Sequence, residues 1–181
     1  MTRIAIIDRA DMSAEQGRVY DTAKAANRPV GGPYCAYIRI PKLFEAAQNM
    51  RGCLGDGPLS KRERQIINLV VARHWGAKYP WCAQVRASLA AGVEQEVIDA
   101  INARQTPALS DLRERTCYNV STELLANKGL SDATYAAADK ALGTDDLVAA
   151  VAATGAFSTT CLTTLAFDVS PPANAPTPLK D

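Results

Sequence analysis

The sequence predicts an all-α protein, and three observations support this fold class. Aromatic residues make up only 6% of the 181 residues while alanine is abundant, which favours closely packed helices over a β-sheet. Apolar residues recur at helical spacing along most of the chain, and helix-capping sequences precede several of these stretches. No segment has the alternating pattern of a convincing strand.

The length and composition fit one domain that spans residues 1–181. Apolar residues account for 48% of the chain and charged residues for 22%, which is ordinary for a soluble globular protein. The net charge is +1, so no basic surface indicates a nucleic-acid partner. We expect a helical core over about residues 10–169 and a proline-rich tail, extended or loose, over residues 170–181.

Capping residues and turn residues place the individual helices in order. Ser13 begins a capping box that opens a helix ending near residue 26, and a turn rich in glycine and proline follows over residues 29–33. A short apolar segment covers residues 34–38. Further helices are expected from Pro41, from Ser60 to about Gly76, from Pro80 to Gly92, over residues 94–101, 111–127 and 131–142, and from Thr144, which caps the last helix.

The last expected helix contains no charged residue between positions 147 and 167, so it must be compared with a membrane span. It contains several threonine and serine residues and has acidic flanks, which make its insertion into a bilayer unfavourable. We therefore expect no membrane contact, and a helix surrounded by protein on every side. One stripe of this helix carries Val148, Val151, Gly155, Ser158, Leu162 and Leu165.

The five cysteines are widely spaced, odd in number and contain no Cys-x-x-Cys pair. This pattern argues against a disulfide framework and against a structural zinc site, and it favours reduced thiols in a cytoplasmic protein. The apolar run at residues 4–7 is too short for a signal peptide. A single histidine and scattered acidic residues supply no convergent ligands, so we expect no metal site.

The segment from Arg73 to Arg86 concentrates the side chains that can carry chemistry. It holds the chain's one histidine, His74, and both tryptophans. This segment resembles the core motif of the carboxymuconolactone decarboxylase family, relatives of the AhpD-type alkylhydroperoxidases. The resemblance rests on residues 59–64, 71–76, 79–81 and 91–93, with further agreement at residues 32–34, 41–43, 123–134 and 165–169.

The resemblance implies an AhpD-like helical bundle whose subunits assemble into trimers or hexamers, with pockets near the subunit contacts. It also implies a small carboxylate or lactone as the substrate, of the kind formed in the catabolism of aromatic compounds. Nothing in the sequence indicates a flavin, nucleotide or metal site, so we expect the protein to act without a cofactor.

The chain departs from both chemical styles of that family. The peroxidase-like branch carries Cys-x-x-Cys-x-x-x-His, and the corresponding positions here are Ala77, Pro80 and Gln84. A two-cysteine peroxidase is therefore disfavoured, because both thiols are required for its chemistry. The other branch carries Tyr-Glu-Trp-x-x-His, a glutamate and a histidine that exchange protons across one helical turn. Pro80 and Gln84 replace that pair, and neither side chain titrates near neutral pH.

Decarboxylation still has candidate residues in this segment. Loss of carbon dioxide from a carboxylated lactone leaves an enolate, so a site must hold the carboxylate, stabilise the enolate oxygen and return a proton. Arg86 can hold the carboxylate, and Gln84 can donate to the enolate oxygen. The proton can come from His74, Tyr79 or Cys82. Trp81, Tyr34 and Cys35 complete the predicted substrate-binding set.

Structural roles compete with each of these assignments. His74 can simply cap a helix end, Cys82 can be a small buried apolar residue, and Arg86 can pair with Glu94 or Glu96. Trp81, Tyr34 and Cys35 can equally belong to the core. Two other functions therefore stay open: a different lyase, isomerase or hydrolase that uses Cys82, and a catalytically silent binding or assembly protein.

Overall fold

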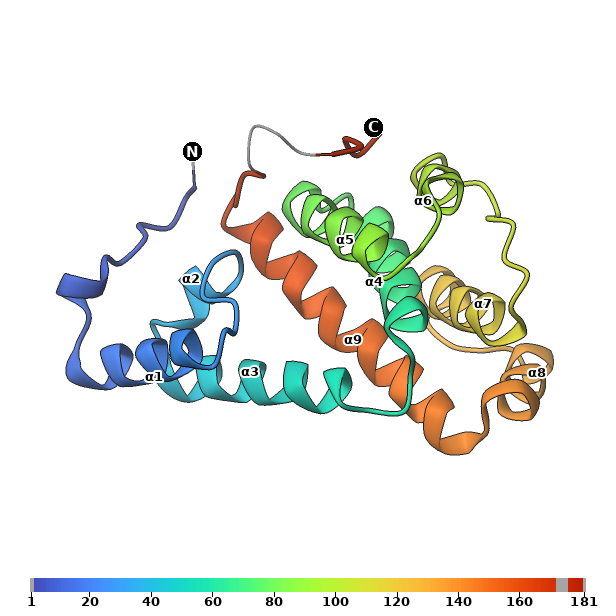
Figure 1. Cartoon of the computed structure of the whole chain (residues 1–181), viewed down its shortest axis with the longest axis horizontal. Coiled ribbons are helices and arrows are strands. Elements are labelled where there is room, and N and C mark those ends of the chain that lie inside the picture. The colour runs from blue at the N-terminus through green and yellow to red at the C-terminus, as the bar shows by residue number, and fades with distance from the viewer. Residues whose placement is uncertain (1, 172–175, 181) are drawn as a thin grey trace.

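The computed structural model describes residues 2–171 and 176–180, and every regular element in that part of the chain is a helix (Figure 1). The all-α prediction is confirmed for these residues. In chain order the elements are the 3-10 turn η1 (Arg9–Asp11) and the helices α1 (Ala14–Ala25), α2 (Tyr34–Tyr37), α3 (Pro41–Gly55), α4 (Lys61–Trp75), α5 (Lys78–Ala90), α6 (Gln95–Asn102), α7 (Leu112–Asn127), α8 (Asp132–Leu142) and α9 (Thr144–Ala166).

The helix ends follow the local signals in the sequence. Ser13 and Ser60 each accept a hydrogen bond from the backbone three residues later, and the returning Gln16 and Glu63 side chains complete two capping boxes. Gly76 ends α4 in the left-handed conformation, as a glycine after a helix does. Two boundaries differ from prediction: α5 begins at Lys78, before Pro80, and Thr144 is the first residue of α9, with Gly143 at the N-cap.

The larger hydrophobic cluster surrounds α4, which packs against α5, α6, α7 and α9. Ile66, Ile67 and Leu69 on α4 are completely buried in it. Two ion-pair groups join the helices at its edge. Arg62 pairs with Glu114 of α7 and with Glu94, while Arg113 of α7 bridges Glu63 of α4 and Asp146 of α9.

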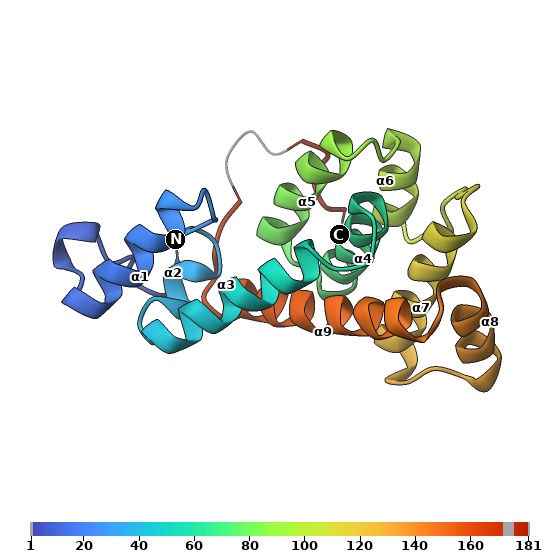
Figure 2. The ribbon, with the colours of Figure 1, turned by 60° about the horizontal axis from the view of Figure 1, so that its bottom comes forward.

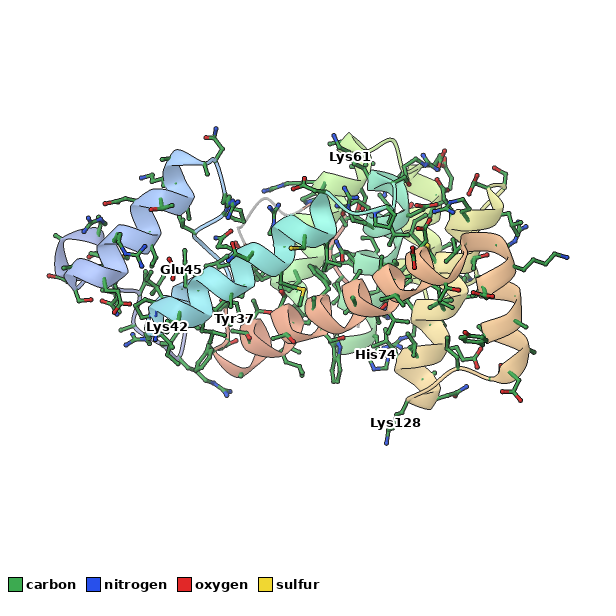
Figure 3. All side chains as sticks on the ribbon, turned by 90° about the horizontal axis from the view of Figure 1, so that it is seen from below. Tyr37, Lys42, Glu45, Lys61, His74 and Lys128 are labelled. Carbon is green, nitrogen blue, oxygen red and sulfur yellow. The ribbon has the colours of Figure 1, made fainter. Side chains whose placement is uncertain are left out.

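The N-terminal helices form a second, smaller cluster beside α9. Figure 1 shows α1–α3 on one side of the diagonal α9 and α4–α8 on the other, and in Figure 2 α1 and α2 lie at the end of the molecule opposite α7 and α8. Phe44 of α3 is 1% exposed and meets the ring of Tyr34 edge-on. The hydroxyl of Tyr37 lies 2.9 Å from Oγ1 of Thr163 on α9, and Figure 3 shows Tyr37 between α3 and α9.

The expectation that protein surrounds α9 on every side is wrong for the isolated chain. Only a third of its most apolar 18-residue window is buried. The helix is long and apolar enough to cross a membrane by length and composition alone, a test that core helices also pass. The exposed aliphatic side chains of α9 are Val148, Val151, Leu162 and Leu165.

The C-terminal end does not remain loose where the structure describes it. Residues 172–175 and 181 of the predicted tail lie outside the described residues. Residues 176–180 form neither helix nor strand, yet side chains of α4, α5 and α6 hold them against the body. This end of the chain lies beside α5 and α6 in both ribbon views (Figures 1 and 2).

Candidate functional site

A cavity of about 540 Å³ lies where the N-terminal segment, α2 and the start of α5 meet. It brings together three of the predicted site residues, Tyr34, Cys35 and Tyr79. The rest of its wall is mostly apolar, which is typical of sites for small organic ligands. The other lining residues include Ile6, Ile7, Met12, Val30 and Ile38, with Asp8, Arg9 and Tyr20 as polar members.

Tyr79 lies in the first turn of α5, and its ring packs against Gly32. A Cβ atom added to Gly32 would come within 2.5 Å of Tyr79 Cε1, so only glycine leaves space for the ring. Gly32 also has a φ of +63°, a conformation that costs other residues energy. Burial raises the pKa of the half-buried Tyr79 hydroxyl, and the nearby Cys35 and Cys82 thiols raise it further.

Tyr34 and Cys35 enter the cavity from the single turn of α2. Burial raises the pKa of both side chains; nearby Arg51 opposes the shift at Tyr34, and backbone hydrogen bonds oppose it at Cys35. The three predicted residues that line the cavity, Tyr34, Cys35 and Tyr79, are therefore protonated near neutral pH. The cavity offers neutral O–H and S–H donors rather than a resting thiolate.

Three predicted residues on α5 are not among the cavity-lining residues. Cys82 is 2% exposed beneath Tyr79, whose pKa it influences. Gln84 is half-buried and accepts a hydrogen bond of 3.3 Å from Asn68 Nδ2. Trp81 is 1% exposed, and its indole N–H donates to the carbonyl oxygen of Thr177 at 2.8 Å.

His74 and Arg86 also lie outside the cavity lining. His74 is exposed at the end of α4, edge-on to Trp75, and Figure 3 places it well apart from Tyr37 along α9. Desolvation lowers the pKa of His74, and the charge of Arg104 lowers it further. Arg86 is exposed on α5. The predicted set thus divides into a group at the cavity and a group elsewhere on α4 and α5.

The N-terminal segment also lines this cavity, a contribution that the sequence did not reveal. The apolar run at residues 4–7, too short for a signal peptide, also fits a pocket wall, and Ile6 and Ile7 line the cavity. Arg3 donates its backbone N–H to Phe167 O at 2.9 Å, and Arg39 donates to Ala5 O at 2.6 Å. These two bonds fix the segment beside α2 and the end of α9. Arg9 is paired through two contacts with Asp21, at 2.9 and 2.6 Å.

A second hollow of about 520 Å³ lies between α7 and α8, but its chemistry is poorer. Alanine and threonine side chains form most of its wall. Its one carboxylate, Glu123, already accepts hydrogen bonds from the backbone of Ser131 and the hydroxyl of Thr134, and these lower its pKa. Across residues 2–171 and 176–180, no group of three potential metal ligands is present.

The comparisons with known proteins agree with this architecture. A profile of the carboxymuconolactone decarboxylase family matches residues 41–123, which include α3, α4, α5, α6 and most of α7. No sequence among the curated proteins matches the chain.

Several solved structures share the fold at low sequence identity. An uncharacterized peroxidase-related protein from Silicibacter sp. TM1040 aligns with a TM-score of 0.79 and 19% identity, covering 99% of this chain and 96% of its own. A peroxidase-related protein with an alkylhydroperoxidase AhpD core from Ralstonia eutropha JMP134 aligns with a TM-score of 0.77 and 18% identity, covering 95% and 93%. A putative AhpD antioxidant defence protein from Agrobacterium tumefaciens aligns with a TM-score of 0.68 and 19% identity, covering 77% and 97%.

The family profile covers the helices that carry the motif, and the structural neighbours share nearly the whole fold. At the motif itself, the acid–base and paired-cysteine positions are occupied by Ala77, a buried Pro80 and the hydrogen-bonded Gln84. Over residues 41–123 the chain is similar to the carboxymuconolactone decarboxylase family, and it shares the fold of the AhpD-like structures, but it lacks the usual motif residues.

Proposed function

We propose that this protein catalyses cofactor-independent proton transfer, of the decarboxylation type, on a small carboxylate or lactone bound in the Tyr79 cavity. One observation carries the proposal: Tyr79, Tyr34 and Cys35 share an apolar cavity, and burial raises the pKa of each. Groups that stay protonated at neutral pH can donate hydrogen bonds to a developing enolate. An apolar wall strengthens those bonds, because it excludes competing water.

The residues divide the chemical tasks as follows. Carbon dioxide leaves with its bonding electrons left on the substrate carbon, and the charge spreads to the carbonyl oxygen as an enolate. Cys35 or Tyr34 stabilises that oxygen by donating a hydrogen bond. Tyr79 delivers its proton to the carbon, and water then returns a proton to the phenolate. Arg9 is the cation in the cavity wall, and although it pairs with Asp21, its charge would attract the departing carboxylate.

The substitution Tyr79→Phe tests this assignment, because it removes the hydroxyl and keeps the ring against Gly32. We expect kcat/KM for carbon dioxide release from a panel of carboxylated lactones to fall at least about 100-fold. The melting temperature should remain within a few degrees, and Tyr135→Phe, at an exposed position on α8, is the matched control. Full activity in Tyr79→Phe would exclude this mechanism.

The same assignment predicts a distinctive pH profile. Because burial raises the pKa of Tyr79 above its usual value of 10.0, the proton donor stays protonated through neutral and mildly alkaline pH. Activity should therefore remain constant there and decline only above pH 10. A decline centred between pH 6 and 8 would indicate a histidine or another group as the donor.

A second candidate function is peroxide reduction, which one contact pattern favours. Cys35 lines the cavity together with Tyr79, and Cys82 follows Tyr79 by one turn of α5, so two thiols from different helices lie near one side chain and both raise its pKa. One thiolate would attack the peroxide, break its O–O bond and become a sulfenic acid. The other would then condense with it to a disulfide and water, and an external dithiol would restore both thiols. The raised pKa of Cys35 limits thiolate formation, which is why this function ranks second.

Peroxide treatment separates the two candidates. Addition of an alkyl hydroperoxide, followed by peptide mass measurement, should show a loss of two hydrogens in a linked Cys35–Cys82 peptide if peroxide reduction is correct. Cys53→Ser is the matched control, because Cys53 is exposed on α3 and absent from the cavity lining. Two free thiols after treatment would eliminate this second candidate.

We further propose that the protein is a cytoplasmic homo-oligomer, a trimer or a hexamer, without nucleic-acid or membrane partners. The exposed aliphatic stripe on α9 supports self-association, since apolar surface of this kind is commonly covered by another subunit. Light scattering on the purified protein measures the assembly. A monomeric mass at micromolar concentration would contradict the proposal.

A further inference from the structure

Residues 176–180 lie across α4, α5 and α6, and we refer to the surface that they cover as the groove. The contacts are made mainly to its backbone, so they recognise an extended chain. Three side-chain donors of the body reach its carbonyl oxygens. They are Trp81 Nε1 to Thr177 O at 2.8 Å, Asn102 Nδ2 to Pro178 O at 2.9 Å, and Arg73 Nη1 to Lys180 O at 2.9 Å.

Asn102 is the central residue of this groove. It is 1% exposed, and its amide uses both ends on the tail. Besides donating to Pro178 O, it accepts the backbone N–H of Lys180 through Oδ1 at 2.9 Å. The Asn102 amide thus donates one hydrogen bond to the backbone of the segment and accepts another, as the backbone of a neighbouring strand does in a β-sheet. Many proteins bind extended peptides through hydrogen bonds of this kind.

The side chains of the segment alternate between the groove and the solvent. Leu179 packs against the main hydrophobic cluster, whereas Pro178 and Lys180 are exposed. Alternation of this kind is expected for an extended chain on a surface. The groove therefore recognises an extended backbone with one aliphatic side chain directed inward.

The docked conformation carries strain at Thr177. Its φ is +42°, which is unfavourable for a β-branched residue. Two contacts hold it there: its carbonyl accepts from Trp81, and its hydroxyl oxygen accepts from Gln95 Nε2 at 3.0 Å. The strain disappears when the segment leaves the groove, and water can then solvate the freed donors. One aliphatic anchor and a set of hydrogen bonds that water can replace make the segment displaceable.

We propose that Arg73, Trp81, Gln95 and Asn102 form a peptide-binding site, and that its own C-terminal segment exchanges there with the same segment of a second copy of this chain. The structure shows the groove fitting this sequence, and backbone recognition does not depend on which copy supplies it. The chain's own segment has the advantage of a high effective concentration. The site is separate from the Tyr79 cavity and does not depend on the proposed reaction.

Two full-length variants separate the groove from its ligand. Leu179→Asp places a charge where the leucine side chain packs, so the groove stays intact but the chain's own C-terminal segment no longer binds in it. Asn102→Ala keeps the segment and damages the groove. Lys180→Ala is the matched control, because the side chain of Lys180 is exposed and its backbone bonds remain.

The probe is a fluorescent five-residue peptide with the sequence of residues 176–180 and blocked ends, with binding followed by anisotropy. We expect it to bind Leu179→Asp at least tenfold more tightly than it binds the wild type or Lys180→Ala, whose own segments compete. Full-length Asn102→Ala should displace the peptide from Leu179→Asp, whereas the double variant Asn102→Ala with Leu179→Asp should neither displace nor bind it.

Three results would overturn the proposal. They are absence of peptide binding to a folded Leu179→Asp chain, equal binding by the double variant, and failure of Asn102→Ala to displace the peptide. Circular dichroism establishes folding of each variant. If Asn102→Ala does not fold, Trp81→Phe removes one donor to the segment and should weaken peptide binding in the Leu179→Asp background.

Discussion

Replacing Gly32 by alanine tests the contact that positions Tyr79 at the cavity. The substitution has two separate costs in the structure. First, Gly32 has a φ of +63°, and a residue with a Cβ loses roughly 1–2 kcal/mol in that conformation. Second, the new Cβ would lie 2.5 Å from Tyr79 Cε1, and relief of such overpacking costs about 1–3 kcal/mol.

The neighbouring glycine supplies a matched control. A Cβ on Gly31 would have Tyr79 Oη at 3.9 Å as its nearest neighbour, an ordinary contact, so Gly31→Ala should change stability by less than about 1 kcal/mol. Gly32→Ala should lose about 3 kcal/mol, which lowers the melting temperature by roughly 6–12 °C in a chain of this length. Urea unfolding and thermal melting of both variants measure the difference.

A double-mutant cycle separates the two costs. In a Tyr79→Ala background the steric part disappears, so Gly32→Ala should then cost only its conformational part, roughly 1–2 kcal/mol. Activity at the cavity should fall in Gly32→Ala and remain in Gly31→Ala, because only the first moves the tyrosine ring. An equal cost of Gly32→Ala in both backgrounds would refute the reasoning, as would equal effects of the two glycine substitutions.

Two further predictions concern charges outside the cavity. Arg113→Ala leaves the buried Glu63 without its cation, so the free energy of unfolding, measured by urea denaturation, should fall by about 3 kcal/mol. The control Arg18→Ala removes a residue from an exposed ion pair and should change this free energy by less than about 1 kcal/mol. Similar losses in the two variants would contradict the assigned roles. Desolvation and the charge of Arg104 hold the pKa of His74 in the folded chain below its usual 6.5. The unfolded chain therefore binds a proton at His74 more readily than the folded chain does. The wild type should lose stability as the pH falls below 6.5 through the folded-state pKa. His74→Gln should show a flatter pH dependence between pH 7 and 5, and an unchanged slope would show that His74 does not contribute.

The helices and their ends could be predicted because they depend on local sequence. Ser13 and Ser60 form their capping boxes within four residues, and Gly76 ends α4 through its own backbone preference. These signals act whatever the rest of the chain does. The motif on α4 and α5 likewise predicted the similarity to the family whose profile matches residues 41–123, since such a motif depends on the order of residues.

The candidate site could be predicted only in part, because a cavity joins residues from distant segments. Tyr79 faces Gly32 and Cys35 across more than forty positions of sequence, and helical periodicity cannot report that contact. Helical periodicity alone would place Tyr79, Cys82 and Arg86, at positions i, i+3 and i+7, on one face of α5. In the structure Tyr79 lines the cavity, Cys82 is buried in the protein interior and Arg86 is exposed on the surface.

By itself, the sequence determined the all-helical class, most helix ends, the similarity to the carboxymuconolactone decarboxylase family and the absence of the usual acid–base pair, since each is read from residue identity and short-range spacing. The tertiary structure alone decided which side chains share a cavity, that one face of α9 is exposed, and that the proline-containing end of the chain binds across α4, α5 and α6. These features arise from packing between helices, where long-range contacts rather than local preferences set the arrangement.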